Sequence, residues 1–189
     1  RNRKNALRRT IVGIIDGWEK VRAGRETDGL FASGSAREAR VRAALADTDA
    51  WLAFTNDSIA RLDKVKDVAA GHSPRRWEAN RALMWAQLHK NRFQLGQYKL
   101  ALDDLAALHN IMPPGNMGWE ISATQRPTLR GPAAEVEKER KEVEALFREI
   151  IEKHPRTPWA LYAESEMKTL NGFGIGPWFV PETGIPHPR

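Results

Sequence analysis

Apolar residues recur along the chain every three or four positions, the spacing that places them on one face of an α-helix. No segment alternates apolar and polar residues convincingly enough to predict a strand. The sequence therefore predicts an all-α fold without a sheet. The six expected helices cover about residues 5–22, 35–70, 74–95, 96–109, 133–153 and 159–170.

Capping residues support the start of two of these helices. Ser35 and Glu38 have the spacing of a capping box, and Ser73 followed by Pro74 is typical of an N-cap and a first-turn proline. In the second helix, one apolar seam has near-heptad spacing, which predicts packing against neighbouring helices of the same chain. The expected seams are Leu7, Ile11, Ile14, Ile15, Trp18 and Val21 in the first helix, and Val41, Leu45, Thr48, Leu52, Thr55, Ile59 and Leu62 in the second.

Glycine and proline divide the chain into three regions. Residues 1–34 are expected to hold a basic arm, the first helix and a Gly-rich loop, and residues 35–170 a helical stack. Within that stack, residues 112–132 contain four prolines and three glycines, which predicts a structured loop. Residues 171–189 contain four glycines and four prolines and should form an extended tail.

One segment, residues 81–113, resembles a tetratricopeptide repeat. The repeat is a helical hairpin in which a small residue lets the helices approach and large residues fill the seam. Two positions depart from the family pattern, because His89 stands where a small residue is preferred and Arg92 where tyrosine is preferred. The resemblance implies a hairpin over 74–113 with its turn at Gly96. The matching residues are Trp85, Leu88, Gly96, Tyr98, Ala101, Leu105, Leu108 and Pro113.

A second resemblance concerns the end of the chain. Thr157–Leu161 resembles the way bacterial envelope proteins of the tetratricopeptide type begin a helix, and residues 154–170 with the Gly/Trp/Pro ending resemble the C-terminal helical region of planctomycete proteins, some with von Willebrand factor A domains. This resemblance implies a scaffold in a bacterial cell envelope or periplasm. The chain opens on Arg1 without an initiating Met, which is typical of a processed product or a piece of a longer protein.

Charge is concentrated at the start of the chain. Residues 1–25 carry eight cations and two carboxylates, a net charge of +6, and residues 26–189 sum to zero. The basic arm could contact nucleic acid phosphates or an anionic surface, but it lacks interleaved aromatic residues and the rest of the chain adds no net positive charge. Nucleic acid is therefore an unlikely partner on this reading. The cations of the arm itself are Arg1, Arg3, Lys4, Arg8 and Arg9.

No pattern in the sequence predicts catalysis, and we expect no enzyme, no cofactor and no metal. There is no cysteine, and no two histidines have the i, i+4 spacing of a helical metal site. The Gly-x-Gly-x-Gly run at 172–176 follows a helix and precedes Pro177, whereas a phosphate loop follows a strand and opens a helix. No apolar run approaches the roughly 20 residues that span a bilayer.

Three aromatic residues in Gly/Pro-rich segments are the candidate partner-binding residues: Trp119, Trp178 and Phe179. A large ring in an extended segment either packs back on its own chain or anchors a partner, and the sequence leaves both readings open. The function expected from these observations is a non-catalytic helical scaffold or protein–protein interaction module with an unidentified protein partner. The alternative is a nucleic-acid or anionic-surface binder that acts through the basic arm.

Overall fold

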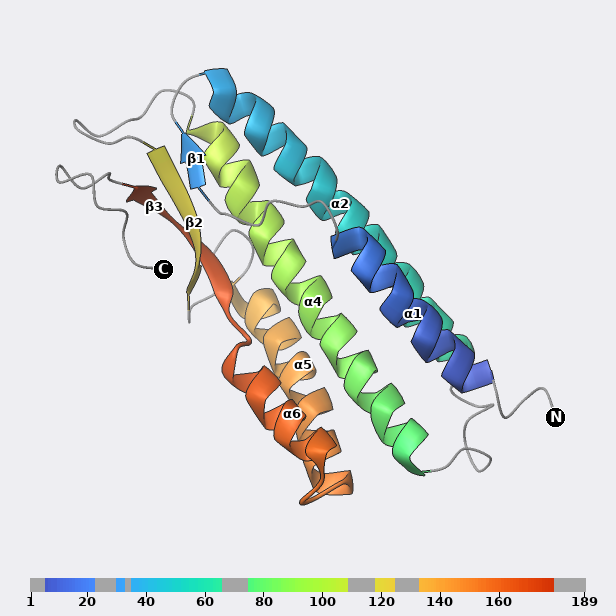
Figure 1. The fold of residues 1–189 in the computed structure, drawn as a ribbon. Helices are drawn as coiled ribbons and strands as arrows, with labels where there is room; N and C mark the ends of the chain where they lie inside the picture. The colour runs from blue at the N-terminus through green and yellow to red at the C-terminus, as the bar shows by residue number, and fades with distance from the viewer. Residues whose placement is uncertain are drawn as a thin grey trace, which may run out of the picture.

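The computed structural model describes residues 6–22, 30–32, 35–65, 75–108, 118–124 and 133–178. Five helices lie within these residues: α1 (Ala6–Arg22), α2 (Ser35–Lys64), α4 (Arg75–Ala107), α5 (Ala133–Lys153) and α6 (Pro158–Lys168). They pack side by side along the long α4 (Figure 1). The prediction of a predominantly helical fold is confirmed, and the described residues form five helices where six were expected.

Three strands pair at one end of the helices, and the prediction that the chain has no sheet is wrong. They are β1 (Leu30–Ala32), β2 (Gly118–Thr124) and β3 (Gly172–Trp178), arranged as an antiparallel sheet in the order β1-β2-β3. The strands come from segments far apart in the sequence, so that the described parts of all three predicted regions pack together (Figure 1). The strands are hard to predict because β1 has only three residues, and because β2 and β3 are short and contain glycine or small residues, which are unfavourable in strands.

The predicted hairpin over 74–113 does not form. Residues 75–107 are one continuous helix, with Gly96 inside it and no turn. Glycine in a helix interior costs only about 1 kcal/mol relative to alanine. That cost is small beside the free energy gained by burying the apolar residues on either side of Gly96. Two of these residues, Phe93 and Ala101, are 1% and 0% exposed.

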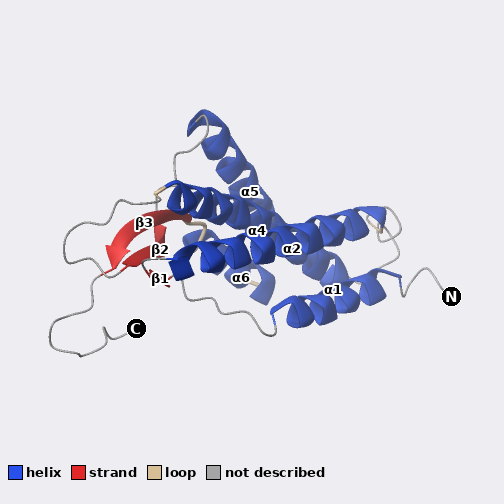
Figure 2. Ribbon diagram, turned by 90° about the horizontal axis from the view of Figure 1, so that it is seen from above, coloured by secondary structure: helices blue, strands red, loops and turns tan. Residues whose placement is uncertain are grey.

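Helix α4 is the centre of the fold because it contributes to all three clusters of buried apolar residues. Near its start it packs with α1 and α2, through residues that include Leu88. Its middle packs with α5 and α6, through residues that include Phe93. Near its end it packs with α2 and the sheet, through residues that include Leu105. Figure 2 shows α1 and α5 on opposite sides of the α2–α4 pair, with α6 on the α1 side.

The predicted seam of α2 packs inside the domain, as expected. Thr48 and Thr55, the two polar members of that seam, are 3% and 0% exposed, and Leu62 is fully buried. Thr48 donates its hydroxyl hydrogen to the carbonyl of Ala44 at 2.7 Å, which satisfies a buried polar group within its own helix. The buried hydroxyl of Thr55, by contrast, has no hydrogen-bond partner among the described residues.

The link between α5 and α6 is tight and well defined by its sequence. Arg156 adopts a positive φ of 61°, which turns the chain, and Thr157 is the N-cap of α6 with Pro158 following it. The Thr157 hydroxyl accepts a hydrogen bond from the Ala160 backbone N–H at 3.4 Å and donates to the His154 carbonyl at 2.5 Å. These contacts fix α6 beside α5 and direct it along α4.

Candidate functional site

A groove opens between α1 and α6, with α4 as its floor. Its volume is about 420 Å³, within the range of typical ligand-binding clefts. Apolar side chains from two helices make up most of its lining, and four polar residues complete it. The lining residues are Ile14, Ile15, Trp18 and Glu19 from α1, Met84, Gln87, Leu88 and Asn91 from α4, and Glu166 from α6.

Helix α1 carries apolar residues that the core does not cover, and one of them, Ile15, lines the groove. Ile11 and Ile14 are 4% and 2% exposed, whereas Val12 and Ile15 are 43% and 46% exposed. The sequence assigned Ile15 to the buried stripe of this helix, and that assignment is wrong. Val12 and Ile15 belong to a second stripe on the flank of α1, between Arg8 and Glu19, at steps of four, three and four residues. The spacing alone does not show which of the two stripes of α1 faces the core.

The indole of Trp18 is held in place by other rings. It meets the ring of Trp51 edge-on at 5.0 Å between centroids and the ring of Phe54 edge-on at 6.2 Å. Edge-to-face contacts of this kind are favourable for aromatic pairs. The apolar wall of the groove is therefore preorganised on its α1 side.

The α6 wall is fixed by a buried lysine of α4. Lys90, whose side chain is 7% exposed, places Nζ 2.6 Å from Glu166 Oε2, 3.0 Å from the Glu166 carbonyl and 2.5 Å from Thr169 Oγ1. Gln87 Nε2 donates to Glu166 Oε1 at 2.8 Å. The ammonium thus pairs with a carboxylate and also satisfies a carbonyl in the last turn of α6, where a cation complements the helix dipole.

The candidate aromatic residues lie in the sheet and not in the groove. Trp119 is half-buried in β2, pairs with Pro177 of β3 and packs against the apolar cluster around Phe31 and Leu105. Trp178 ends β3 opposite Gly118 and is also half-buried. Phe179 lies outside the described residues. The fold itself therefore uses Trp119 as a packing residue between sheet and helices.

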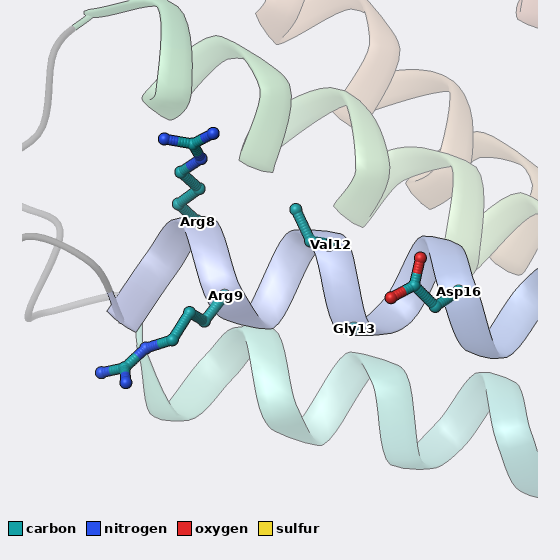
Figure 3. Close-up of a pocket in the computed structure, with 5 residues that line it drawn as sticks. All are labelled: Arg8, Arg9, Val12, Gly13 and Asp16. Carbon is teal, nitrogen blue, oxygen red and sulfur yellow. The ribbon is translucent and has the colours of Figure 1, made fainter.

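The basic arm is described only in part, since Arg1, Arg3 and Lys4 lie outside the described residues. Arg8 and Arg9 are exposed in α1 and point to different sides of that helix, beside a shallow hollow of about 510 Å³ (Figure 3). Arg8 places its guanidinium 5.7 Å from the centre of the Trp77 ring, in cation–π geometry. The carboxylate of Asp16 lines the same hollow and lowers the net positive charge of the hollow.

The described residues contain neither a candidate metal site nor a helix that could span a membrane. Within the described ranges, no group of three or more His, Asp or Glu side chains could hold a metal ion. None of the helices in that part of the chain is both long and apolar enough to cross a membrane.

His89 is a half-buried titratable group of α4 that does not line the groove. Its ring packs on the Trp85 ring at 4.8 Å, and Arg92 Nη2 lies 3.4 Å from its Nδ1. Because a guanidinium only donates, Nδ1 accepts and neutral His89 carries its proton on Nε2, which is buried without a partner among the described residues. Burial lowers the pKa of His89 below 6.5, Arg92 lowers it further, and Asp63 and Glu142 oppose this shift.

We therefore expect the fold to lose stability in mild acid. The unfolded chain binds a proton at His89 more readily than the folded chain does. The fold is therefore most stable where His89 is neutral in both states, above the unfolded pKa of about 6.5. It loses stability as the pH falls through the lower pKa of the folded state. Between pH 7.5 and lower pH, the free energy of unfolding measured in urea should fall further for the parent than for His89→Gln. Equal losses in the two proteins would show that His89 does not titrate in this way.

Comparison of the chain with protein-family models, with curated protein sequences and with solved structures gave no match.

Proposed function

We propose that this chain is a non-catalytic helical scaffold that holds a partner protein in the groove between α1 and α6. The observation that carries the proposal is the exposure of Ile15, at 46%, on the wall of an apolar groove. Apolar residues gathered on a concave surface are typical of a protein-binding site. Leu88 at the groove floor is buried, which gives the site a rigid base.

The physical case rests on preorganisation. Ordered walls lower the entropy cost of binding, because few side chains must be immobilised when the partner arrives. Trp18 is fixed by two aromatic neighbours, and Glu166 by Lys90 and Gln87. A partner segment would therefore meet a formed surface. Tryptophan, tyrosine and arginine residues at the centre of an interface usually carry most of the binding energy, which favours Trp18 as an anchor.

Capture of partners from a lysate of the producing organism tests this proposal. The tagged parent chain, Ile15→Glu and Leu161→Glu are compared at moderate salt. Leu161 is a matched control, since it is an exposed apolar residue on α6 that does not line the groove. We expect a protein that the parent and Leu161→Glu retain and that Ile15→Glu loses, because a buried carboxylate costs several kcal/mol.

The same experiment separates the groove from the basic arm. A partner held by Arg8 and Arg9 would be released by salt and would be lost from a variant with Arg8→Gln and Arg9→Gln, but not from Ile15→Glu. Deleting residues 1–9 is a poorer test, since it would remove Leu7, which is 2% exposed in the core. Capture that depends on salt and arginines alone would contradict the groove proposal.

A further inference from the structure

The polar residues that line the groove are either acidic or neutral. The charged members are the carboxylates of Glu19 and Glu166, the neutral members are the amides of Gln87 and Asn91, and no cation is among the described lining residues. Lys90 stands behind the groove and partly neutralises Glu166. Its three N–H donors, however, already meet three acceptors, so that it offers none to a ligand.

Glu166 retains the capacity to accept a further charged donor. Its side chain is 27% exposed, and each carboxylate oxygen accepts one hydrogen bond in the structure, from Gln87 or from Lys90. A carboxylate oxygen has a second lone pair, which a lysine or arginine of a ligand could use. Glu19 is exposed on the facing wall. The two carboxylates therefore flank the α4 floor from both sides.

The charges are also ordered along the exposed stripe of α1, of which Ile15 and Glu19 line the groove and Arg8 and Val12 line the neighbouring hollow. Arg8 and Glu19 are the two ends of the exposed stripe of α1 and stand eleven residues apart, which is about 16 Å along a helix. Val12 and Ile15 lie between them. A segment lying along this stripe meets a cation at one end, apolar side chains in the middle and carboxylates at the other end.

Resting on the proposed function, we propose that the occupant of the groove is an amphipathic helix of a partner protein, with basic residues at one end. Its apolar stripe packs on Ile15, Trp18 and Met84, and a lysine or arginine reaches Glu19 and Glu166. A helix of about three to four turns covers the length of the stripe. Helix-in-groove binding suits this shape, because residues at i, i+3, i+4 and i+7 of one helix enter one apolar floor.

A displayed library of random peptides, each long enough for four helical turns, tests the chemistry without knowledge of the natural partner. It is panned on the parent chain, on Ile15→Glu, on Glu19→Lys and on Glu152→Lys. Glu152 is exposed on α5, away from the groove, and serves as the charge-matched control. Because Glu19 and Glu152 are both exposed, neither change should disturb the fold.

The parent and Glu152→Lys should enrich peptides with apolar residues at helical spacing and a basic end. Peptides selected on the parent should bind Glu19→Lys at least about tenfold more weakly, and Glu19→Lys should itself select acidic peptides. If the enriched peptides are acidic or uncharged but still fail to bind Ile15→Glu, the inference of a basic partner helix is wrong, while the groove remains the binding surface. Failure to enrich any peptide sensitive to Ile15→Glu would overturn the groove proposal as well.

Discussion

Replacing Lys90 with alanine should destabilise the protein by about 3 kcal/mol, since removing one partner of a buried ion pair leaves the other charge uncompensated. The lysine side chain is 7% exposed, whereas Glu166 is 27% exposed and keeps the Gln87 amide, which places the expected loss at the lower end of the usual range. The change also removes a donor to the Glu166 carbonyl and to Thr169. Urea unfolding monitored by circular dichroism measures the loss.

Two further variants show whether the charge or the packing is responsible. Lys90→Met keeps the aliphatic stem but removes the ammonium, and we expect a loss close to that of Lys90→Ala. Lys138→Ala is the control, because this lysine is 77% exposed and lies 4.0 Å from Glu142 in a solvent-exposed pair worth less than about 1 kcal/mol. If Lys90→Met were as stable as the parent, the ion pair would not be what fixes α6 to α4.

Gly118→Ala should also destabilise the protein, by about 1–3 kcal/mol, through overpacking in the sheet. A Cβ at this position would stand 2.5 Å from the Phe31 carbonyl oxygen and 3.3 Å from Trp178 Cε3. The obstructing oxygen belongs to the backbone of the paired strand β1, so that relief requires the two strands to move apart. Thermal or urea unfolding measures the change.

Gly176→Ala is the matched control for this prediction. Gly176 lies in β3 of the same sheet, but a Cβ there would meet no atom within 4 Å. We expect no loss at this position, and a gain of up to about 1 kcal/mol from the lower entropy of the unfolded chain. Equal effects of the two substitutions would show that the contact with Phe31 does not decide the outcome.

The helices were predictable because each has a local signal. The bounds expected for the first and fifth helices lie within a residue of α1 and α5, and Ser35 begins α2 as its capping spacing indicates. Gly96 was misleading. A single glycine predicts a turn only where packing does not compete, and here Phe93 and Ala101 on either side of it are buried in one straight helix.

The sheet was missed because its strands stabilise one another only after long segments have come together. Phe173, Ile175 and Pro177 alternate with three glycines, and β2 places Trp119 and Ile121 on the same face through the pairs with Pro177 and Ile175. The pairing buries Phe31 and Ile121 to 1% and 5% exposure. Both β2 and β3 do alternate large apolar residues with polar residues or glycine, but the runs are short and lie in Gly/Pro-rich segments, and the sequence does not show which distant strand each one pairs with.

The groove was missed for a related reason. The sequence analysis selected Trp119 and Trp178 as candidates because they are aromatic residues in Gly/Pro-rich segments. Ile15 was assigned to the buried apolar stripe of α1. Whether Ile15 faces the core depends on how α1 rotates against α2 and α4. That rotation is set by contacts such as the rings of Trp18 and Phe54 and is not encoded in the spacing of α1 alone.

Site-specific photocrosslinking tests most directly whether the groove holds a partner protein. A benzophenone amino acid is placed at Ile15 in the groove wall or at Leu161 on α6, positions that are 46% and 66% exposed, and each protein is irradiated in a lysate of the producing organism. The groove account predicts a discrete protein adduct from position 15 and none from position 161. Adducts of equal yield from both positions, or from position 161 alone, would contradict it.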